Sequence, residues 1–117
     1  MAQYNTAVLA QRLRIYSQAL TAYEYALAIQ PGSTDARYNF ALTLRAAGYI
    51  PDAVNEFKKV VAAKPNDSRA HLALGNIYAQ TLHDPDLARS QYLKVLELEP
   101  DSPQASDIRF WLAANPE

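Results

Sequence analysis

The chain has 117 residues, of which 50% are hydrophobic, with 11 basic and 12 acidic residues and no cysteine. This size and apolar content suffice for one domain with a buried core. The lack of cysteine excludes disulfides, thiolate metal sites and a cysteine nucleophile. The net charge of −1 gives no overall attraction to nucleic acid or anionic lipid.

Two targeting signals are also missing from this sequence. No apolar run approaches the roughly 20 residues that span a bilayer. The first residues lack the basic and then apolar build of a signal peptide. We therefore expect no membrane insertion, and the compartment stays open, with the cytoplasm favoured.

The first half of the chain has the spacing of amphipathic helices, because residues at i, i+3, i+4 and i+7 share a helix face. We expect helices over residues 3–13 and 16–29, the second ending at Pro31-Gly32. Ser33 or Thr34 can accept hydrogen bonds from the free amides of the next helix, residues 34–47. Gly48 ends that helix, and Pro51 suits the first turn of its successor.

The second half has stronger helix-start signals. The run Asn66-Asp67-Ser68 offers three caps for a helix over residues 68–81. Asp84-Pro85-Asp86 then supplies a cap, a proline at the first position and a carboxylate at the positive end of the helix dipole. Ser102-Pro103 repeats the cap and proline pattern and predicts a last helix over residues 103–114, with Phe110 off its apolar face.

These segments repeat. Three prolines stand 34 and 35 residues apart, and each follows an alanine and an aromatic residue four positions later: Pro31, Pro65 and Pro100 after Ala19/Tyr23, Ala53/Phe57 and Ala88/Tyr92. The preceding helices carry Leu74-Gly75 with Tyr78, Phe40-Ala41 with Leu44 and, less closely, Thr6-Ala7 with Ala10. The extra residue of the third unit falls in the loop 81–84, where it disturbs no packing. The pattern resembles the tetratricopeptide repeat.

The resemblance implies an all-α solenoid of about seven helices, paired antiparallel and stacked into a right-handed superhelix. Residues 1–117 would form a single domain, with repeats at about 1–33, 34–67 and 68–102 and a capping helix at about 103–114. Small residues such as Gly75 would let paired helices approach closely. One pair cannot bury its apolar face alone, so the pairs must stack.

In this family the first helix of each repeat lines a concave groove that binds peptides. The groove-facing positions in this sequence are Tyr4, Asn5, Val8, Arg12, Tyr38, Asn39, Leu42, Arg45, Arg69, Leu72 and Asn76. Aromatic side chains supply contact area, amides can bond a peptide backbone, and arginine can fork onto a carboxylate. Such a protein would be a non-enzymatic protein–protein interaction module.

The expected ligand is acidic. The first helices carry Arg12, Arg37, Arg45 and Arg69 against Asp35 alone, a net charge of +3, whereas the remaining residues carry −4. We therefore expect a peptide with acidic residues and one apolar side chain. The alternative is that Asn39 only bonds a neighbouring helix and that the arginines are solvated.

Chemistry of other kinds has little support. His71 occupies a position where the family has a large aromatic residue, and we expect it to be packed. His83 lies near Asp84 and Asp86, but the spacing matches no zinc or calcium loop. No phosphate-binding glycine loop or catalytic triad pattern occurs. We expect no catalysis, no cofactor and no metal.

The sequence bears on three other functions. The chain could be a structural or self-assembly unit of a longer array, associating through the ends of its repeats. It could read single-stranded RNA like the related pentatricopeptide repeats, but its acidic balance and small-residue contacts count against this. Relatives that bind chaperone tails use a Lys, Asn and Arg clamp, of which only Asn39 is present, so chaperone-tail binding is not expected.

Overall fold

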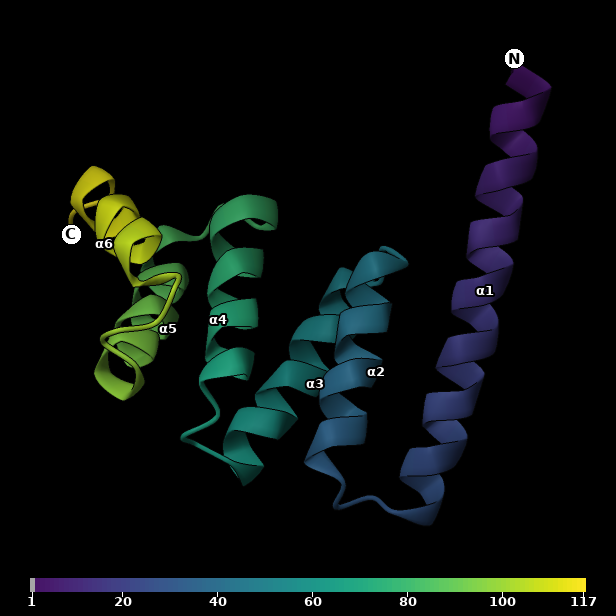
Figure 1. Cartoon of the computed structure of the whole chain (residues 1–117), viewed down its shortest axis with the longest axis horizontal. Helices are drawn as coiled ribbons and strands as arrows, with labels where there is room; N and C mark the ends of the chain where they lie inside the picture. The colour runs from purple at the N-terminus through teal and green to yellow at the C-terminus, as the bar shows by residue number, and fades with distance from the viewer. Residues whose placement is uncertain (1) are drawn as a thin grey trace. The chain divides into compact units, whose positions relative to one another are not determined.

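The structure is a computed structural model that describes the backbone of residues 2–117 and the side chains of residues 13–117. These residues form six α-helices and one π-helical turn, without a strand (Figure 1). The elements are α1 (Ala2–Ile29), α2 (Thr34–Ala46), α3 (Ile50–Ala63), α4 (Ser68–Asn76), η1 (Ile77–Thr81), α5 (Pro85–Leu98) and α6 (Ala105–Ala114). The all-α prediction is confirmed. None of the helices in this described part combines the length and apolarity needed to cross a membrane.

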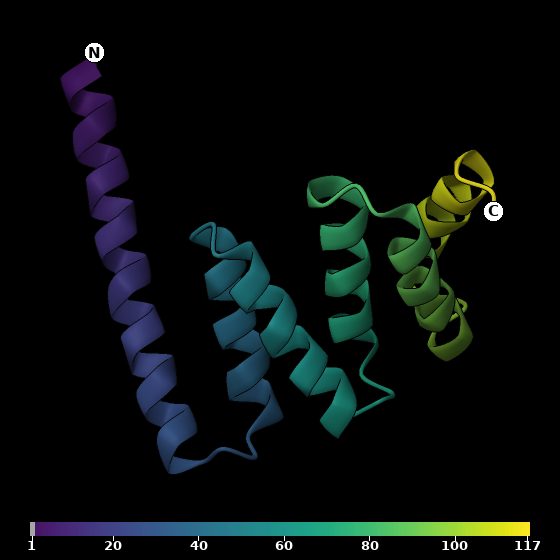
Figure 2. The same ribbon diagram turned by 180° about the vertical axis from the view of Figure 1, so that it is seen from behind.

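The chain divides into two compact units, and the division falls inside α3, after Glu56. In the first unit α2 packs against α1. In the second unit α5 packs against α4 and η1, and α6 packs against α5 (Figure 2). The single domain over residues 1–117 and its repeat boundaries stay predictions.

The prediction of separate helices over residues 3–13 and 16–29 is wrong, because α1 is one helix of 28 residues. No glycine or proline occurs between Ala2 and Ile29. One repeat later Gly48 and Pro51 occupy the places that Arg14 and Ser17 hold in α1. Neither Arg14 nor Ser17 terminates a helix as glycine or proline does, so the helix continues through these positions. Figure 1 shows α1 extending past the end of α2 within the first unit.

The turn between α2 and α3 shows what α1 lacks. Gly48 has a φ of 93°, a conformation that glycine adopts without a steric cost. The Tyr49 N–H donates to the Leu44 carbonyl at 2.8 Å, and the Gly48 N–H donates to the Arg45 carbonyl at 3.0 Å. This is the Schellman arrangement, and it satisfies the last carbonyls of α2.

The helix predicted over residues 68–81 is present as α4 followed by η1. In η1 the hydrogen bonds widen, and the Leu82 N–H donates to the Ile77 carbonyl at 2.9 Å. A π-turn holds one more residue than an α-turn, which accounts for the longer third repeat. The chain then turns at His83, whose φ is 52°. The π-turn therefore takes up the extra residue immediately before the expected loop 81–84.

Small residues lie where helices approach most closely, as predicted. A Cβ added to Gly75 would lie 2.7 Å from the Tyr92 Cδ1 and Cε1 atoms. Ala41, Ala53 and Ala88 are fully buried. A larger side chain at any of these positions would push the helices apart.

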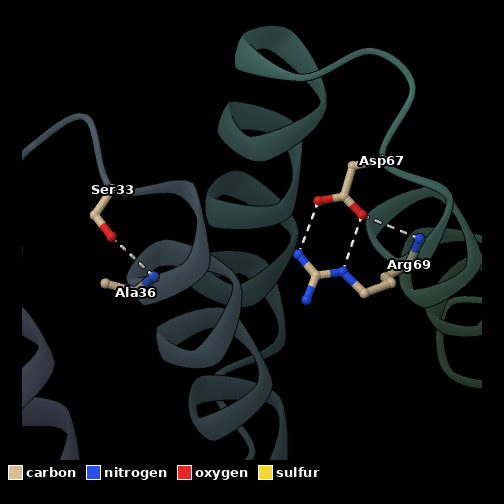
Figure 3. Close-up of polar contacts among 4 residues, drawn as sticks. All are labelled: Ser33, Ala36, Asp67 and Arg69. Carbon is tan, nitrogen blue, oxygen red and sulfur yellow. Dashed lines mark hydrogen bonds and ion pairs between the residues drawn. The ribbon is translucent and has the colours of Figure 1, made fainter.

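Three predicted caps are confirmed. The Ser33 hydroxyl accepts from the Ala36 N–H at 3.3 Å (Figure 3), and the Asp84 carboxylate accepts from the Leu87 N–H at 3.2 Å. Of the three caps offered to α4, Asp67 is the one used. Each cap satisfies an amide that the helix itself leaves unpaired.

The predicted start of the last helix at residue 103 is wrong, because α6 begins at Ala105. The Ser102 hydroxyl accepts from the Gln104 N–H at 3.2 Å, and the Ser102 carbonyl accepts from the Ala105 N–H at 3.0 Å. Ser102 therefore closes a turn that contains Pro103 and does not cap the helix. Ile108 of α6 is buried, whereas Phe110 is 78% exposed, in agreement with its place off the apolar face.

The close helix contacts can be tested at Ala88. An Ala88→Phe substitution should lower the free energy of unfolding by about 1–3 kcal/mol or more, because the site has no room for a ring. Thermal unfolding measures the loss. Ala62→Phe is the matched control, since Ala62 is exposed on α3. Equal melting temperatures for the two variants would contradict the packing described.

Candidate functional site

The predicted groove residues of the second repeat share one face of α2. Asn39 and Leu42 are exposed, and Tyr38 and Arg45 are half-buried. The opposite face is buried through Phe40, Ala41 and Leu44. The helix thus offers an aromatic ring, an amide, an aliphatic side chain and a guanidinium along one side. The side chains of Tyr4, Asn5, Val8 and Arg12 lie outside the described residues.

The predicted residues of the third repeat lie on α4, where Arg69 is exposed and Leu72 and Asn76 are half-buried. The guanidinium of Arg69 binds the carboxylate of Asp67 through two hydrogen bonds, from Nε to Oδ1 at 3.1 Å and from Nη2 to Oδ2 at 3.0 Å (Figure 3). The hydrogen bond from Arg69 lowers the pKa of Asp67 below its ordinary value of 3.8, against a smaller opposing effect of burial. Asp67 therefore balances the positive charge of Arg69, one of the arginines predicted to line the groove.

Arg37, which also lies on the first helix of a repeat, is paired as well. The Arg37 Nη1 atom lies 2.6 Å from Glu56 Oε2, and Nη2 donates to the Pro31 carbonyl at 3.0 Å. Both charged side chains are largely buried. The sequence count missed these pairs because Asp67 lies just before α4 and Glu56 lies on α3, so neither belongs to a first helix. The net positive charge of the first helices is therefore smaller than the residue count implied.

The second unit has a cavity of about 290 Å³ that joins α4 to α5 and α6. It brings two predicted residues, Leu72 and Asn76, together with six others: Gln80, Tyr92, Gln104, Asp107, Ile108 and Trp111. The repeat pattern includes Tyr92, and the predicted last helix contains Trp111. The sequence did not predict that both would line a site, because that depends on how α6 packs.

Aromatic and amide groups set the geometry of this cavity. The Tyr92 hydroxyl donates to Asn76 Oδ1 at 2.7 Å. The Tyr92 and Trp111 rings meet edge to face, with centroids 5.1 Å apart at 70°. Since Oδ1 of Asn76 is used, its Nδ2 group is the one that can donate to a ligand. Asn76 thus bonds a neighbouring helix through Oδ1, whereas the alternative stated for Asn39 stays a prediction.

The first unit has another cavity, of about 420 Å³, and none of the predicted groove residues lines it. It lies between α1 and the turn from α2 to α3, with walls that include Tyr16, Leu20 and Tyr49. Its two charged residues are Glu24 and Asp52. This cavity therefore differs from the predicted groove in position and in charge.

The two histidines have no ligand-binding arrangement. His71 is buried, as expected, with Nδ1 2.7 Å from Gln91 Oε1 and Nε2 2.8 Å from the Pro65 carbonyl. His83 is exposed, and Asp84 beside it caps α5. Within the described residues, no three His, Cys, Asp or Glu side chains gather as metal ligands would.

Antiparallel helix pairs, a 34-residue spacing and small residues at the helix contacts define a helical-repeat protein. Two family models described as "Tetratricopeptide repeat" match residues 16–77 and 68–102. The chain belongs to the tetratricopeptide repeat family, whose members are generally non-enzymatic modules for protein–protein interaction. Its all-helical fold is consistent with the α-solenoid class of that family. The first match begins at residue 16. It therefore leaves out residues 3–13, where a separate first helix was expected.

Two relatives come from Arabidopsis thaliana. The "TPR repeat-containing thioredoxin TTL4" is 35% identical over 63 residues, and the "Inactive TPR repeat-containing thioredoxin TTL3" is 38% identical over 63 residues. Each match covers 54% of this chain and 9% of the relative. The similarity thus extends over a small part of those longer proteins.

The Asp67 cap gives a stability prediction. Asp67→Ala should lower the free energy of unfolding by about 0.5–2 kcal/mol, because α4 loses its cap. Arg69→Ala keeps the cap and should cost less, since Arg69 is exposed and exposed ion pairs contribute about 0–1 kcal/mol. Chemical denaturation of both variants measures the difference. An equal loss in both would contradict the capping role.

The same cap predicts a pH dependence. A carboxyl whose pKa is lowered by folding stabilises the folded state above its ordinary value, and that contribution is lost as the pH falls through the lowered pKa. The difference in stability between the wild type and Asp67→Ala should therefore be full above pH 3.8 and shrink in stronger acid. A difference that stays constant down to pH 2 would contradict the Asp67–Arg69 pairing.

Proposed function

We propose that this chain binds a peptide segment of a partner protein along the first helices of its repeats, without catalysing a reaction. The observation that carries the proposal is the cavity that gathers Leu72, Asn76 and Trp111. An aromatic wall beside an amide donor suits one apolar side chain and the adjoining peptide backbone. The exposed face of α2 supplies a second surface of the same type.

Charge supports acidic residues in the peptide near α2. Arg45 is half-buried beside exposed Leu42 and Asn39, and a partly desolvated guanidinium favours a carboxylate partner. In the second unit Asp107 lines the cavity, and Asp67 pairs with Arg69. An apolar side chain fits that cavity better than a carboxylate does. The proposed ligand therefore carries acidic and apolar residues in separate segments.

The predicted binding is weak and sensitive to salt. Exposed charge contacts contribute little individually, so a dissociation constant of about 1 μM is expected, rising with ionic strength. A peptide selected from a random library against the wild-type chain provides the probe. Replacing Tyr38 and Arg45 together by alanine should raise the dissociation constant at least about tenfold in calorimetry.

A matched control distinguishes the site from a general effect. Tyr49→Ala with Arg14→Ala removes the same two residue types from exposed positions away from the α2 face. This variant should bind like the wild type. If the Tyr38 and Arg45 variant keeps its affinity while its helicity is unchanged, the peptide does not bind along α2 and the proposal fails.

A second candidate function is self-assembly as a structural unit. The observation in its favour is the set of exposed apolar residues on α1, which includes Ile15, Tyr25 and Ile29. Exposed apolar surface of this kind often marks an interaction site.

A further inference from the structure

The cavity between α4, α5 and α6 carries one negative charge. Asp107 is the charged residue among the described residues that line it, and amides stand beside it at Asn76, Gln80 and Gln104. The Asp107 side chain is exposed, and no side chain that the structure describes forms an ion pair with it. Its carboxylate is therefore available to a ligand in the cavity.

The lysines and arginines on these three helices are held by other groups. The contacts are Arg69 with Asp67, Arg89 with Asp86, Lys94 with Glu97, and Arg109 with the Pro100 carbonyl. Asp107 lies in the first turn of α6, where the helix dipole stabilises a carboxylate. The dipole supplies only about half a unit charge, so the cavity keeps a negative charge.

The remaining walls of the cavity are apolar or aromatic. They come from Leu72, Ile108 and the rings of Tyr92 and Trp111. The Tyr92 hydroxyl is already bonded to Asn76. A long side chain with a charged end suits such walls, because its methylene groups cover apolar surface while the charge stays at the polar rim. The faces of aromatic rings also attract cations.

We propose that this cavity binds a lysine or arginine side chain of the partner peptide, with the stem against Leu72, Ile108 and Trp111 and the cationic group at Asp107. The inference rests on the proposed function and narrows the apolar side chain proposed there to one that ends in a positive charge. The volume of about 290 Å³ lies just below the roughly 300–1,000 Å³ of pockets for drug-sized ligands. It therefore suits one side chain better than a larger ligand.

The charge of Asp107 sets the expected order of preference among side chains. A glutamate side chain in the cavity would be repelled by Asp107. A purely apolar side chain would cover the same walls and gain nothing from the carboxylate. Because Asp107 is exposed, its contribution is small, and a cationic end should improve affinity about three- to fivefold.

The experiment uses Trp111, the single tryptophan of the chain, whose indole N–H gives an isolated signal in a proton–nitrogen correlation spectrum. The probes are capped peptides of the sequence Gly-Ser-X-Ser-Gly, in which X is lysine, arginine, norleucine or glutamate. Each is added up to about 20 mM, well above the dissociation constant of about 1 mM expected for a single side chain. The lysine or the arginine peptide should bind about three- to fivefold more tightly than the norleucine peptide, and the glutamate peptide should bind most weakly.

Two variants test whether Asp107 is the source of the preference. Asp107→Asn keeps the shape of the side chain and removes its charge, so the lysine and norleucine peptides should then bind equally. Asp101→Asn is the matched control, because Asp101 is exposed just before α6 and does not line the cavity. This variant has the same net charge as Asp107→Asn and should keep the wild-type preference.

The outcomes separate this inference from the proposed function. If the norleucine peptide binds the wild type as tightly as the lysine and arginine peptides, or if their preference survives in Asp107→Asn, the cation assignment is overturned while peptide binding stands. If none of the peptides shifts the Trp111 signal, the cavity takes no such side chain, and its part in the proposed function fails as well. Binding along α2 is tested separately by the Tyr38 and Arg45 variant.

Discussion

The positions at which the backbone leaves the α-helix decide which helices of this chain can pair. Gly48 takes a φ of 93° between α2 and α3, and Pro85 follows the η1 turn and starts α5. Each of these residues ends or begins a helix for a local steric reason. Arg14 and Ser17 impose no such constraint, so α1 continues for 28 residues. The same constraint that forms the later helix pairs leaves one side of α1 exposed.

The candidate site depends on a second constraint, the close approach of helices in the third repeat. Gly75 has no side chain, so the Tyr92 ring can lie against its backbone. From there the Tyr92 hydroxyl reaches Asn76, and the ring meets Trp111 of α6. Tyr92 thus packs in the buried core and also lines the cavity. Core and site share their residues here, which limits how freely either can change.

Much of the fold could be predicted from the sequence because its signals are local. The caps at Ser33 and Asp84 and the small residue at Gly75 each act on neighbouring atoms or on a contact fixed by the repeat. The separate first helix was predicted from residue spacing, although no helix-breaking residue supports it. The pairing of Arg69 with Asp67 and the place of Trp111 depend on side-chain geometry and on the packing of α6, which residue spacing does not specify.

The length of α1 is the central claim, and a distance within one chain tests it most directly. Spin labels at Gln3→Cys and Ala28→Cys, in labelled chains diluted with unlabelled chain, report only the distance inside a single copy. A continuous helix separates these positions by about 38 Å. A separate first helix folded back on the second would bring the labels to about 10 Å, the distance between packed helices. The first result is predicted, and the second would contradict the account of α1.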